Sequence, residues 1–243
     1  MAAFRHAVET GIDILEFDLI PTLDGQLAVH HDLAVHAPLC QAPGGKPFPF
    51  GPIRAMTFAQ LRELDCGSWR DPRFPNQAAA PGEKLLTLGD VLAAFPSKSR
   101  FLVETKMAKD GAADFVDPQE FAAMIAKTVR RHKARERFIL QSGDYRTLDA
   151  MKRLEPSIAT CLVNARRFKP DYLPLARKHR ADYLMLGVAD TNAAQVAELK
   201  SAGFRVLSNV INDAAGWRAA LDLGMQGLMT DDPDELKRFL ARR

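Results

Sequence analysis

Residues 12–20 read IDILEFDLI, a largely apolar run in which Glu16 and Asp18 lie two positions apart. Such a run, rich in Ile, Leu and Phe, is typical of a buried β-strand. Side chains alternate across a strand, so both carboxylates point to the face that also carries Ile12 and Ile14. The two should repel each other unless a cation lies between them, which predicts a metal or catalytic role. The alternative is a pair of surface or salt-bridged acids on an edge strand, and the apolar neighbours argue against it.

Residues 101–106, FLVETK, repeat this arrangement further along the chain. Glu104 and Lys106 share one face at the end of the strand. A carboxylate and an ammonium that converge on one place suit a metal and an anionic substrate, with Glu104 for the cation and Lys106 for phosphate. A structural ion pair between the two is the other interpretation. Glu16, Asp18 and Glu104 together would form an all-oxygen site, which favours Mg²⁺ or Ca²⁺ over zinc.

Two further segments carry candidate polar groups at strand ends. Residues 29–32, VHHD, follow a Leu-Asp-Gly turn, and adjacent histidines on a strand point to opposite faces. Only one of His30 and His31 can therefore enter the site, where a histidine suits proton transfer to a leaving oxygen. Ser142 follows the apolar run FILQ, and its hydroxyl could bind substrate or cap the next helix.

Short apolar runs alternate with helical patterns along the chain, as a parallel α/β sheet requires. The expected parallel strands are residues 12–20, 101–104, 138–142, 159–163, 183–187, 205–210 and 227–230, and the main helices between and after them are 118–132, 145–154, 171–178, 192–202, 213–223 and 232–240. These are seven strands, whereas a closed (β/α) barrel needs eight, and a helix at residues 2–10 precedes the first of them. We expect one domain, residues 1–243, with the fold of a TIM-type (β/α)8 barrel that lacks its first strand.

A long region at about residues 33–96 interrupts this alternation. It is rich in Pro and Gly and contains two short helical patterns, at residues 58–64 and 88–95. Long loops within a compact domain are usually functional. We expect this inserted region to lie over the carboxyl ends of the strands, where barrel enzymes build their sites.

Composition excludes several classes of protein. The chain is 47% hydrophobic and 26% charged, with a net charge of +3 and no basic stripe, which disfavours nucleic acid as a partner. Cys40, Cys66 and Cys161 show no C-x-x-C spacing, so three ordinary thiols are expected rather than a disulfide framework or a zinc site. No run approaches the roughly 20 apolar residues of a membrane span. The first residues form an amphipathic helix pattern, so the sequence as written predicts a cytoplasmic protein.

Taken together and in order, five segments resemble the glycerophosphodiester phosphodiesterase family. They are AFRHAVETGIDILEFDLIPTLDGQLAVHHD at residues 3–32, LLTLGDVLAAF at 85–95, FLVETK at 101–106, FILQSGDYRTL at 138–148 and LGMQGLMTDDPDEL at 223–236. The resemblance covers nearly the whole chain, with a loose match over residues 40–80.

The resemblance implies a role for each candidate residue. Glu16, Asp18 and Glu104 would bind one divalent cation, and His31 rather than His30 would be the catalytic acid or base. Lys106 would contact the phosphate. The fold would be a TIM barrel, and the enzyme would hydrolyse glycerophosphodiesters to glycerol 3-phosphate and an alcohol. The oligomeric state is left open.

Family members also open with a strand that ends in His-Arg-Gly, and this sequence has no such strand. That strand contributes a second catalytic histidine and a phosphate-binding arginine, so we expect the chain as written to have little activity. A signal peptide ahead of such a strand would place the protein in the periplasm or outside the cell. The alternative function is a non-catalytic barrel that binds a phosphorylated ligand or a partner.

Overall fold

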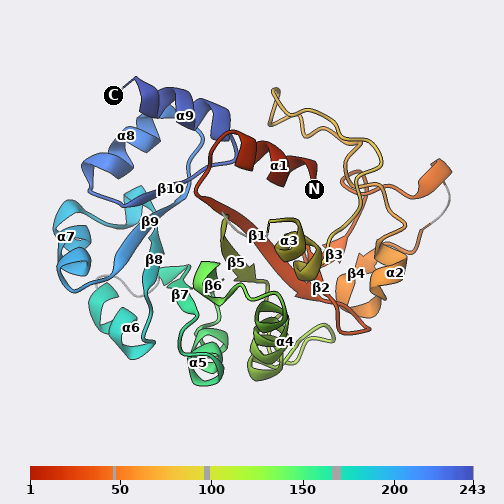
Figure 1. Ribbon diagram of the computed structural model, residues 1–243, viewed down its shortest axis with the longest axis horizontal. Coiled ribbons are helices and arrows are strands. Elements are labelled where there is room, and N and C mark those ends of the chain that lie inside the picture. Colours follow the sequence, from red (N-terminus) through yellow and green to blue (C-terminus); the bar gives the residue numbers. More distant parts are fainter. Residues whose placement is uncertain (46–47, 96–98, 166–170, 243) are drawn as a thin grey trace.

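The computed structural model describes the 243-residue chain except for residues 46–47, 96–98, 166–170 and 243. Its main feature is an eight-stranded sheet with the order β10-β9-β8-β7-β6-β5-β1-β2. The sheet curls into an open barrel wall, and helices α4 to α8 cover its outer side (Figure 1). The predicted class, a (β/α) barrel, is confirmed.

The strands of the large sheet fall close to the predicted ranges. They are β1 (Ile14–Pro21), β2 (Leu27–Val29), β5 (Arg100–Thr105), β6 (Phe138–Ser142), β7 (Ala159–Leu162), β8 (Tyr183–Leu186), β9 (Arg205–Val210) and β10 (Gly227–Met229). Every neighbouring pair is parallel except β1 and β2, which form an antiparallel pair at Leu19–Pro21. The apolar runs thus become strands buried between an inner side-chain layer and an outer helical layer.

The helices also match the predicted pattern within a few residues. They are α1 (Ala2–Glu9), α2 (Phe58–Leu61), α3 (Leu88–Ala94), α4 (Pro118–Arg131), α5 (Tyr145–Leu154), α6 (Tyr172–Lys178), α7 (Ala193–Ser201), α8 (Ala214–Asp222) and α9 (Pro233–Ala241). Asp232 caps α9, since its carboxylate accepts a hydrogen bond from the backbone N–H of Glu235. None of the helices in the described ranges has the length and apolar character needed to cross a membrane.

The two faces of the sheet have different surroundings. Outward-facing residues such as Leu15, Phe17 and Val103 belong to the large core beneath the helices. Inward-facing residues form a smaller cluster that includes Leu102, Ile139 and Cys161. The inner face is therefore apolar deep in the barrel, and its charged residues lie further along β1 and β5.

The barrel wall is open between its first and last parallel strands. Within the described residues, β1 pairs with β5 and β2, and β10 pairs only with β9, so the sheet does not close. Helices α1 and α9 approach each other at this side (Figure 1), where His6 Nε2 lies 2.7 Å from Oδ2 of Asp234. The seven parallel strands without closure agree with the prediction from the sequence.

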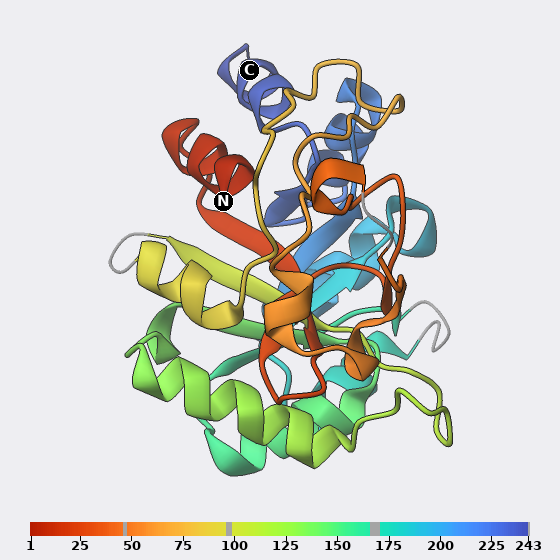
Figure 2. The same ribbon diagram turned by 90° about the vertical axis from the view of Figure 1, so that its right-hand side faces the viewer.

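The segment between β2 and α3, residues 30–87 and described except for 46–47, forms a small layer of its own beside β1, and we call it the insertion. In Figure 2 the insertion is drawn in orange to gold and faces the viewer. It contains the two-stranded sheet of β3 (Ala34–Val35) and β4 (Gly51–Pro52). A separate apolar cluster holds it together, and its members include Val35, Ile53 and Leu61.

The insertion also corrects the prediction of three ordinary thiols. Cys40 and Cys66 form a disulfide, and only Cys161 is a free cysteine among the described residues. Gln41 and Asp65 pair their backbones right beside the bridge, with both N···O distances 2.8 Å. The fold of the insertion therefore brings together two cysteines that are 26 residues apart, and their spacing in the sequence does not predict this pairing.

Candidate active site

Three carboxylates meet on the inner face at the carboxyl ends of β1 and β5. Glu16 and Asp18 come from β1, and Glu104 from β5, where it is the register partner of Asp18. Each offers one oxygen such that these atoms all lie within 4.8 Å of one another. Alternation along β1 and parallel pairing with β5 are sufficient to produce this group, as the sequence predicted. These three residues could together hold a metal ion, and we call them the cation site.

The surroundings of the cation site oppose negative charge. Burial, together with the neighbouring charges of Asp18 and Glu104, raises the pKa of Glu16 to about 8. Burial also raises the pKa of Glu104, where the charge of Lys106 acts in the opposite direction. Carboxylates in such a place are stabilised by a positive charge that binds them together.

Lys106 provides one such charge in this structure. Its Nζ lies 2.9 Å from Oδ1 of Asp18 and 3.1 Å from Oε2 of Glu104. Burial alone would lower the pKa of Lys106, but the two carboxylates raise it. The ion pair with Glu104, one of the two interpretations of FLVETK, is thus present, and it extends to Asp18.

The two adjacent histidines occupy different surroundings. The side chain of His31 is 73% exposed, and its Nδ1 lies 2.7 Å from Oδ1 of Asp32. His30 is buried, and its Nδ1 lies 2.8 Å from the backbone carbonyl oxygen of Asp32 and 3.1 Å from the backbone nitrogen of the same residue. His31 lines the same cavity as Glu104 and Lys106. The exposed side chain of His31 therefore lies at the same cavity as Glu104 and Lys106.

This cavity, which we call the mouth cavity, has a volume of about 790 Å³. It lies where the insertion meets the ends of β5, β6 and β7, and it is lined by His31, Asp32, Leu33, Glu104, Thr105, Lys106, Met107, Ala108, Lys109, Asp110, Gly143, Asp144, Tyr145 and Asn164. Its size falls within the range of small-molecule sites, about 300–1,000 Å³. Polar groups of both signs line it, as a charged substrate requires.

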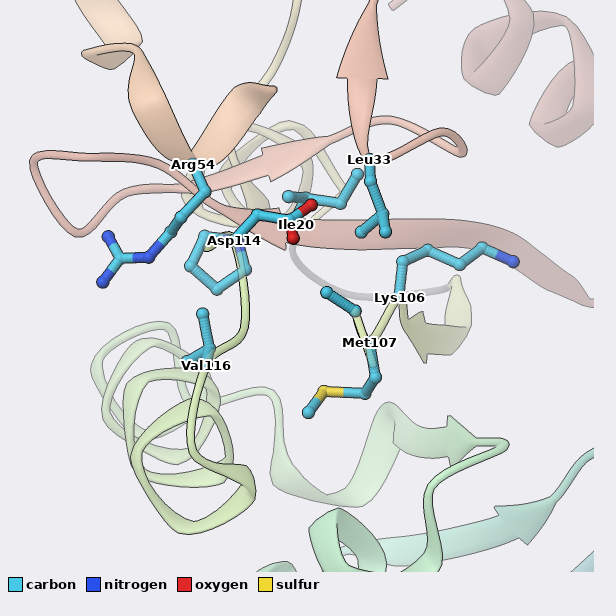
Figure 3. Close-up of a pocket in the computed structure, with 9 residues that line it drawn as sticks. Ile20, Leu33, Arg54, Lys106, Met107, Asp114 and Val116 are labelled. Carbon is cyan, nitrogen blue, oxygen red and sulfur yellow. The ribbon is translucent and has the colours of Figure 1, made fainter. Parts of the chain in front are cut away.

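A second, smaller pocket adjoins the mouth cavity and shares four lining residues with it, Leu33, Lys106, Met107 and Ala108. Figure 3 shows this pocket, with the charged ends of Lys106 and Arg54 extending away from it in different directions. Arg54 instead donates a hydrogen bond to the carbonyl oxygen of Thr22 at 2.7 Å. The small pocket therefore combines apolar side chains with the carboxylate of Asp114, and none of the three carboxylates of the cation site lines it.

Ser142 and Gln141 lie side by side on β6 but have different partners. Ser142 is fully buried, and its hydroxyl accepts hydrogen bonds from Thr105 Oγ1 at 2.7 Å and from the backbone N–H of Asp144 at 3.0 Å. Its predicted contact with substrate stays a prediction. Gln141 was not predicted at all, yet its Nε2 donates to Oε1 of Glu16 at 2.6 Å. The sequence feature that could have indicated this role is the position of Gln141 on the inward face of the strand FILQS.

The chain has an open (β/α) barrel with an acidic cluster and a large cavity at the carboxyl ends of its strands. Barrel enzymes build their phosphate and metal sites at this end, so the fold and the site place the chain in that class. A sequence profile described as "Glycerophosphoryl diester phosphodiesterase family" matches residues 1–235. The chain belongs to this family of phosphoric diester hydrolases, as its motifs indicated.

Individual relatives agree with this assignment. The putative glycerophosphodiester phosphodiesterase YhdW of Bacillus subtilis is 26% identical over 240 residues, covering 96% of this chain and 88% of the relative. A putative glycerophosphoryl diester phosphodiesterase from Silicibacter pomeroyi has a crystal structure that matches with a TM-score of 0.86 at 26% identity, covering 98% of this chain and 86% of that one. A phosphodiesterase from Oleispira antarctica, solved with the product sn-glycerol-3-phosphate, matches in fold with a TM-score of 0.81 at 21% identity, covering 99% and 90% of the two chains.

Proposed function

We propose that the chain is a metal-dependent phosphodiesterase of glycerophospholipid metabolism that hydrolyses glycerophosphodiesters to glycerol 3-phosphate and an alcohol. The observation that carries the proposal is that Glu104, one of the three residues of the cation site, lines one cavity together with Lys106 and His31. The product bound to the Oleispira antarctica phosphodiesterase, which shares the fold, supports the same product here.

The residues of the cation site fit one Mg²⁺ or Ca²⁺. All three ligands are carboxylates, and both cations prefer oxygen ligands. Burial and the repulsion of neighbouring carboxylates raise the pKa values of Glu16 and Glu104, so a cation bound there would favour their ionised forms. A cation bound there would stabilise negative charge on the phosphate during the reaction.

His31 and Lys106 have separate tasks in this proposal. Hydrolysis breaks the bond between phosphorus and the alcohol oxygen, adds the oxygen of a water molecule to phosphorus and leaves a proton on the alcohol. Asp32 holds Nδ1 of His31, so Nε2 is the nitrogen that exchanges a proton with the alcohol oxygen or the water. Lys106 contributes a positive charge near the phosphate, and Ser142 is a second candidate for binding it.

Release of glycerol 3-phosphate from glycerophosphocholine and glycerophosphoethanolamine tests the proposal. We expect release that EDTA abolishes and that Mg²⁺ or Ca²⁺ restores. Calorimetry should detect cation binding to the wild type and not to Glu16→Gln. A protein that binds the cation but releases no product, with or without an added strand as described next, would contradict hydrolysis and favour a barrel that only binds a phosphorylated ligand.

The open side of the barrel is part of the proposal. In the described chain, the edge of β1 over Ile14–Asp18 and the free edge of β10 have no strand between them. We propose that a strand placed there, with a histidine and an arginine at its carboxyl end, increases activity, because one acid–base group contributes about 10²–10⁴-fold. Equal rates for the chain with and without an added strand that ends in His-Arg-Gly would contradict this part.

The disulfide favours one of the two compartments considered from the sequence. Disulfides persist in oxidising compartments and are rare in the cytosol. The Cys40–Cys66 bridge therefore supports a periplasmic or extracellular location over a cytoplasmic one. Alkylation of free thiols in intact cells tests this: we expect only Cys161 to be reduced. Three reduced cysteines would contradict it.

A further inference from the structure

Gln141 is a buried amide side chain where the apolar inner cluster of the barrel meets the carboxylates of β1 and β5. It lies on β6 between two register partners, Glu104 on β5 and Cys161 on β7. Its residue is fully buried, and the inward-facing residue two positions earlier, Ile139, belongs to the apolar inner cluster. A polar side chain in this position has no solvent to satisfy it, so its contacts within the protein determine its role.

The amide of Gln141 has one contact that is directed at the cation site. Its Nε2 donates a hydrogen bond to Oε1 of Glu16 at 2.6 Å, across a sequence separation of 125 residues. Lys106 forms ion pairs with the other two carboxylates, Asp18 and Glu104, and none with the carboxylate of Glu16. Among the described residues, Gln141 is thus the side chain that donates a hydrogen bond to Glu16. This bond uses Oε1 of Glu16, so Oε2 can bind a cation.

The opposite end of the same amide has no partner. Oε1 of Gln141 is buried and accepts no hydrogen bond from any described residue. Leaving a buried acceptor unpaired is unfavourable, so stability alone does not explain an amide here. An apolar residue would suit the surroundings of Ile139 and Cys161 better, whereas only a donor can orient the carboxylate of Glu16.

We propose that Gln141 is a positioning residue that holds the Glu16 carboxylate in the orientation in which it completes the cation site. One oxygen of Glu16 is tied to β6, and the carboxylate can no longer rotate freely about its side-chain bonds. Partners of this kind commonly change metal affinity by about 10–100-fold when they are removed. The inference rests on the proposed function, because it requires a cation at Glu16, Asp18 and Glu104.

Gln141→Leu removes the donor while nearly keeping the volume of the side chain. We expect calorimetric titration with Mg²⁺ and with Ca²⁺ to show affinity weaker by about 10–100-fold, with the protein still folded and melting cooperatively. The rate of glycerol 3-phosphate release should fall at low cation concentration and recover towards the wild-type kcat at saturating cation. A merely structural role would instead lower the melting temperature and leave the cation dependence unchanged.

Thr160→Val provides the matched control. Thr160 lies on the neighbouring strand β7, is also fully buried, and has a hydroxyl oxygen without a hydrogen-bond partner among the described residues. Its register partner Leu140 belongs to the outer core, so Thr160 is directed away from the cation site. We expect wild-type cation affinity in this variant.

Two results would overturn the inference, and they are distinguishable. Wild-type cation affinity in Gln141→Leu, with the expected loss in Glu16→Gln, would overturn the role of Gln141 alone. No cation binding by the wild-type protein would overturn the cation site of the proposed function and this inference with it.

Discussion

Asp18 and Glu104 face each other in the register of β1 and β5, and one ammonium, that of Lys106, lies within 3.1 Å of a carboxylate oxygen of each. A divalent cation at the cation site would use the same two carboxylates. Ammonium and cation therefore share ligands and repel each other. In the proposed function, Lys106 would therefore affect both the occupancy of the cation site and the positive charge available to the phosphate.

The first prediction concerns Lys106→Met, which keeps most of the side-chain volume and removes the charge. We predict that cation affinity increases by about tenfold, equivalent to about 1.4 kcal/mol, because the competing positive charge is gone. The KM for the glycerophosphodiester should increase at the same time, since the phosphate loses a positive neighbour. Calorimetry measures the first effect and steady-state kinetics the second.

Lys109→Met is the control for this prediction. Lys109 also lines the mouth cavity, but no described carboxylate lies within 4.0 Å of its ammonium. Its removal should leave cation affinity nearly unchanged. Weaker cation binding by Lys106→Met, or equal gains in both variants, would show that Lys106 does not compete for the cation site.

The second prediction concerns pH and Glu16. Burial, helped by Asp18 and Glu104, raises the pKa of Glu16 from 4.5 to about 8. Between these two values the unfolded chain has lost the proton and the folded protein keeps it, so this group makes the folded state less stable as pH rises. Each pKa unit corresponds to about 1.4 kcal/mol, so the effect reaches several kcal/mol.

Thermal melts in EDTA between pH 5 and pH 8 measure this dependence. The wild type should lose stability over that range more steeply than Glu16→Gln, which cannot titrate at this position. Cation affinity should rise over the same range, because the cation must displace the proton. Parallel melting curves for the two proteins would contradict the raised pKa.

The strands and helices were predictable because each has a strong local pattern. The strand predicted for FILQS has the same bounds as β6 (Phe138–Ser142) in the structure. A short apolar run between two helical patterns is typical of a strand buried on both faces. The cation site followed from alternation within IDILEFDLI and from adjacency of two parallel strands. Both arguments use spacings that a β-strand fixes.

The features that were missed depend on chain paths with no local pattern. The Cys40–Cys66 disulfide closes a Pro- and Gly-rich region whose course the sequence does not determine, so the cysteines were wrongly predicted to be separate thiols. Gln141 reaches Glu16 from a strand beyond the neighbouring one. A single amide in an apolar run carries no motif, and its partner is defined only once the sheet has curled.

The third prediction concerns His31, which the resemblance selected over His30. We predict that His31→Gln lowers kcat/KM by about 10²–10⁴-fold, the range for loss of a general acid or base, with little change in cation affinity. His36→Gln is the control, because His36 is also exposed and its Nε2 lies 3.7 Å from the same Asp32. Equal losses in the two variants would assign the effect to Asp32 rather than to catalysis by His31.

The fourth prediction concerns the disulfide in the insertion. The bridge joins residues that are 26 apart, and a loop of this length stabilises a fold by about 3 kcal/mol in the chain-entropy description. The double variant Cys40→Ser, Cys66→Ser should therefore melt at a lower temperature than the wild type. Activity per folded molecule should change little, since neither cysteine lines the mouth cavity.

Reduction of the wild-type protein gives an independent measurement of the same effect. Dithiothreitol should lower the melting temperature of the wild type towards that of the double variant and leave the double variant unchanged. Cys161→Ala is the control, because Cys161 is buried and free, and this variant should respond to the reductant as the wild type does. A double variant that melts at the wild-type temperature would mean that the apolar cluster of Val35, Ile53 and Leu61 holds the insertion without help from the bridge.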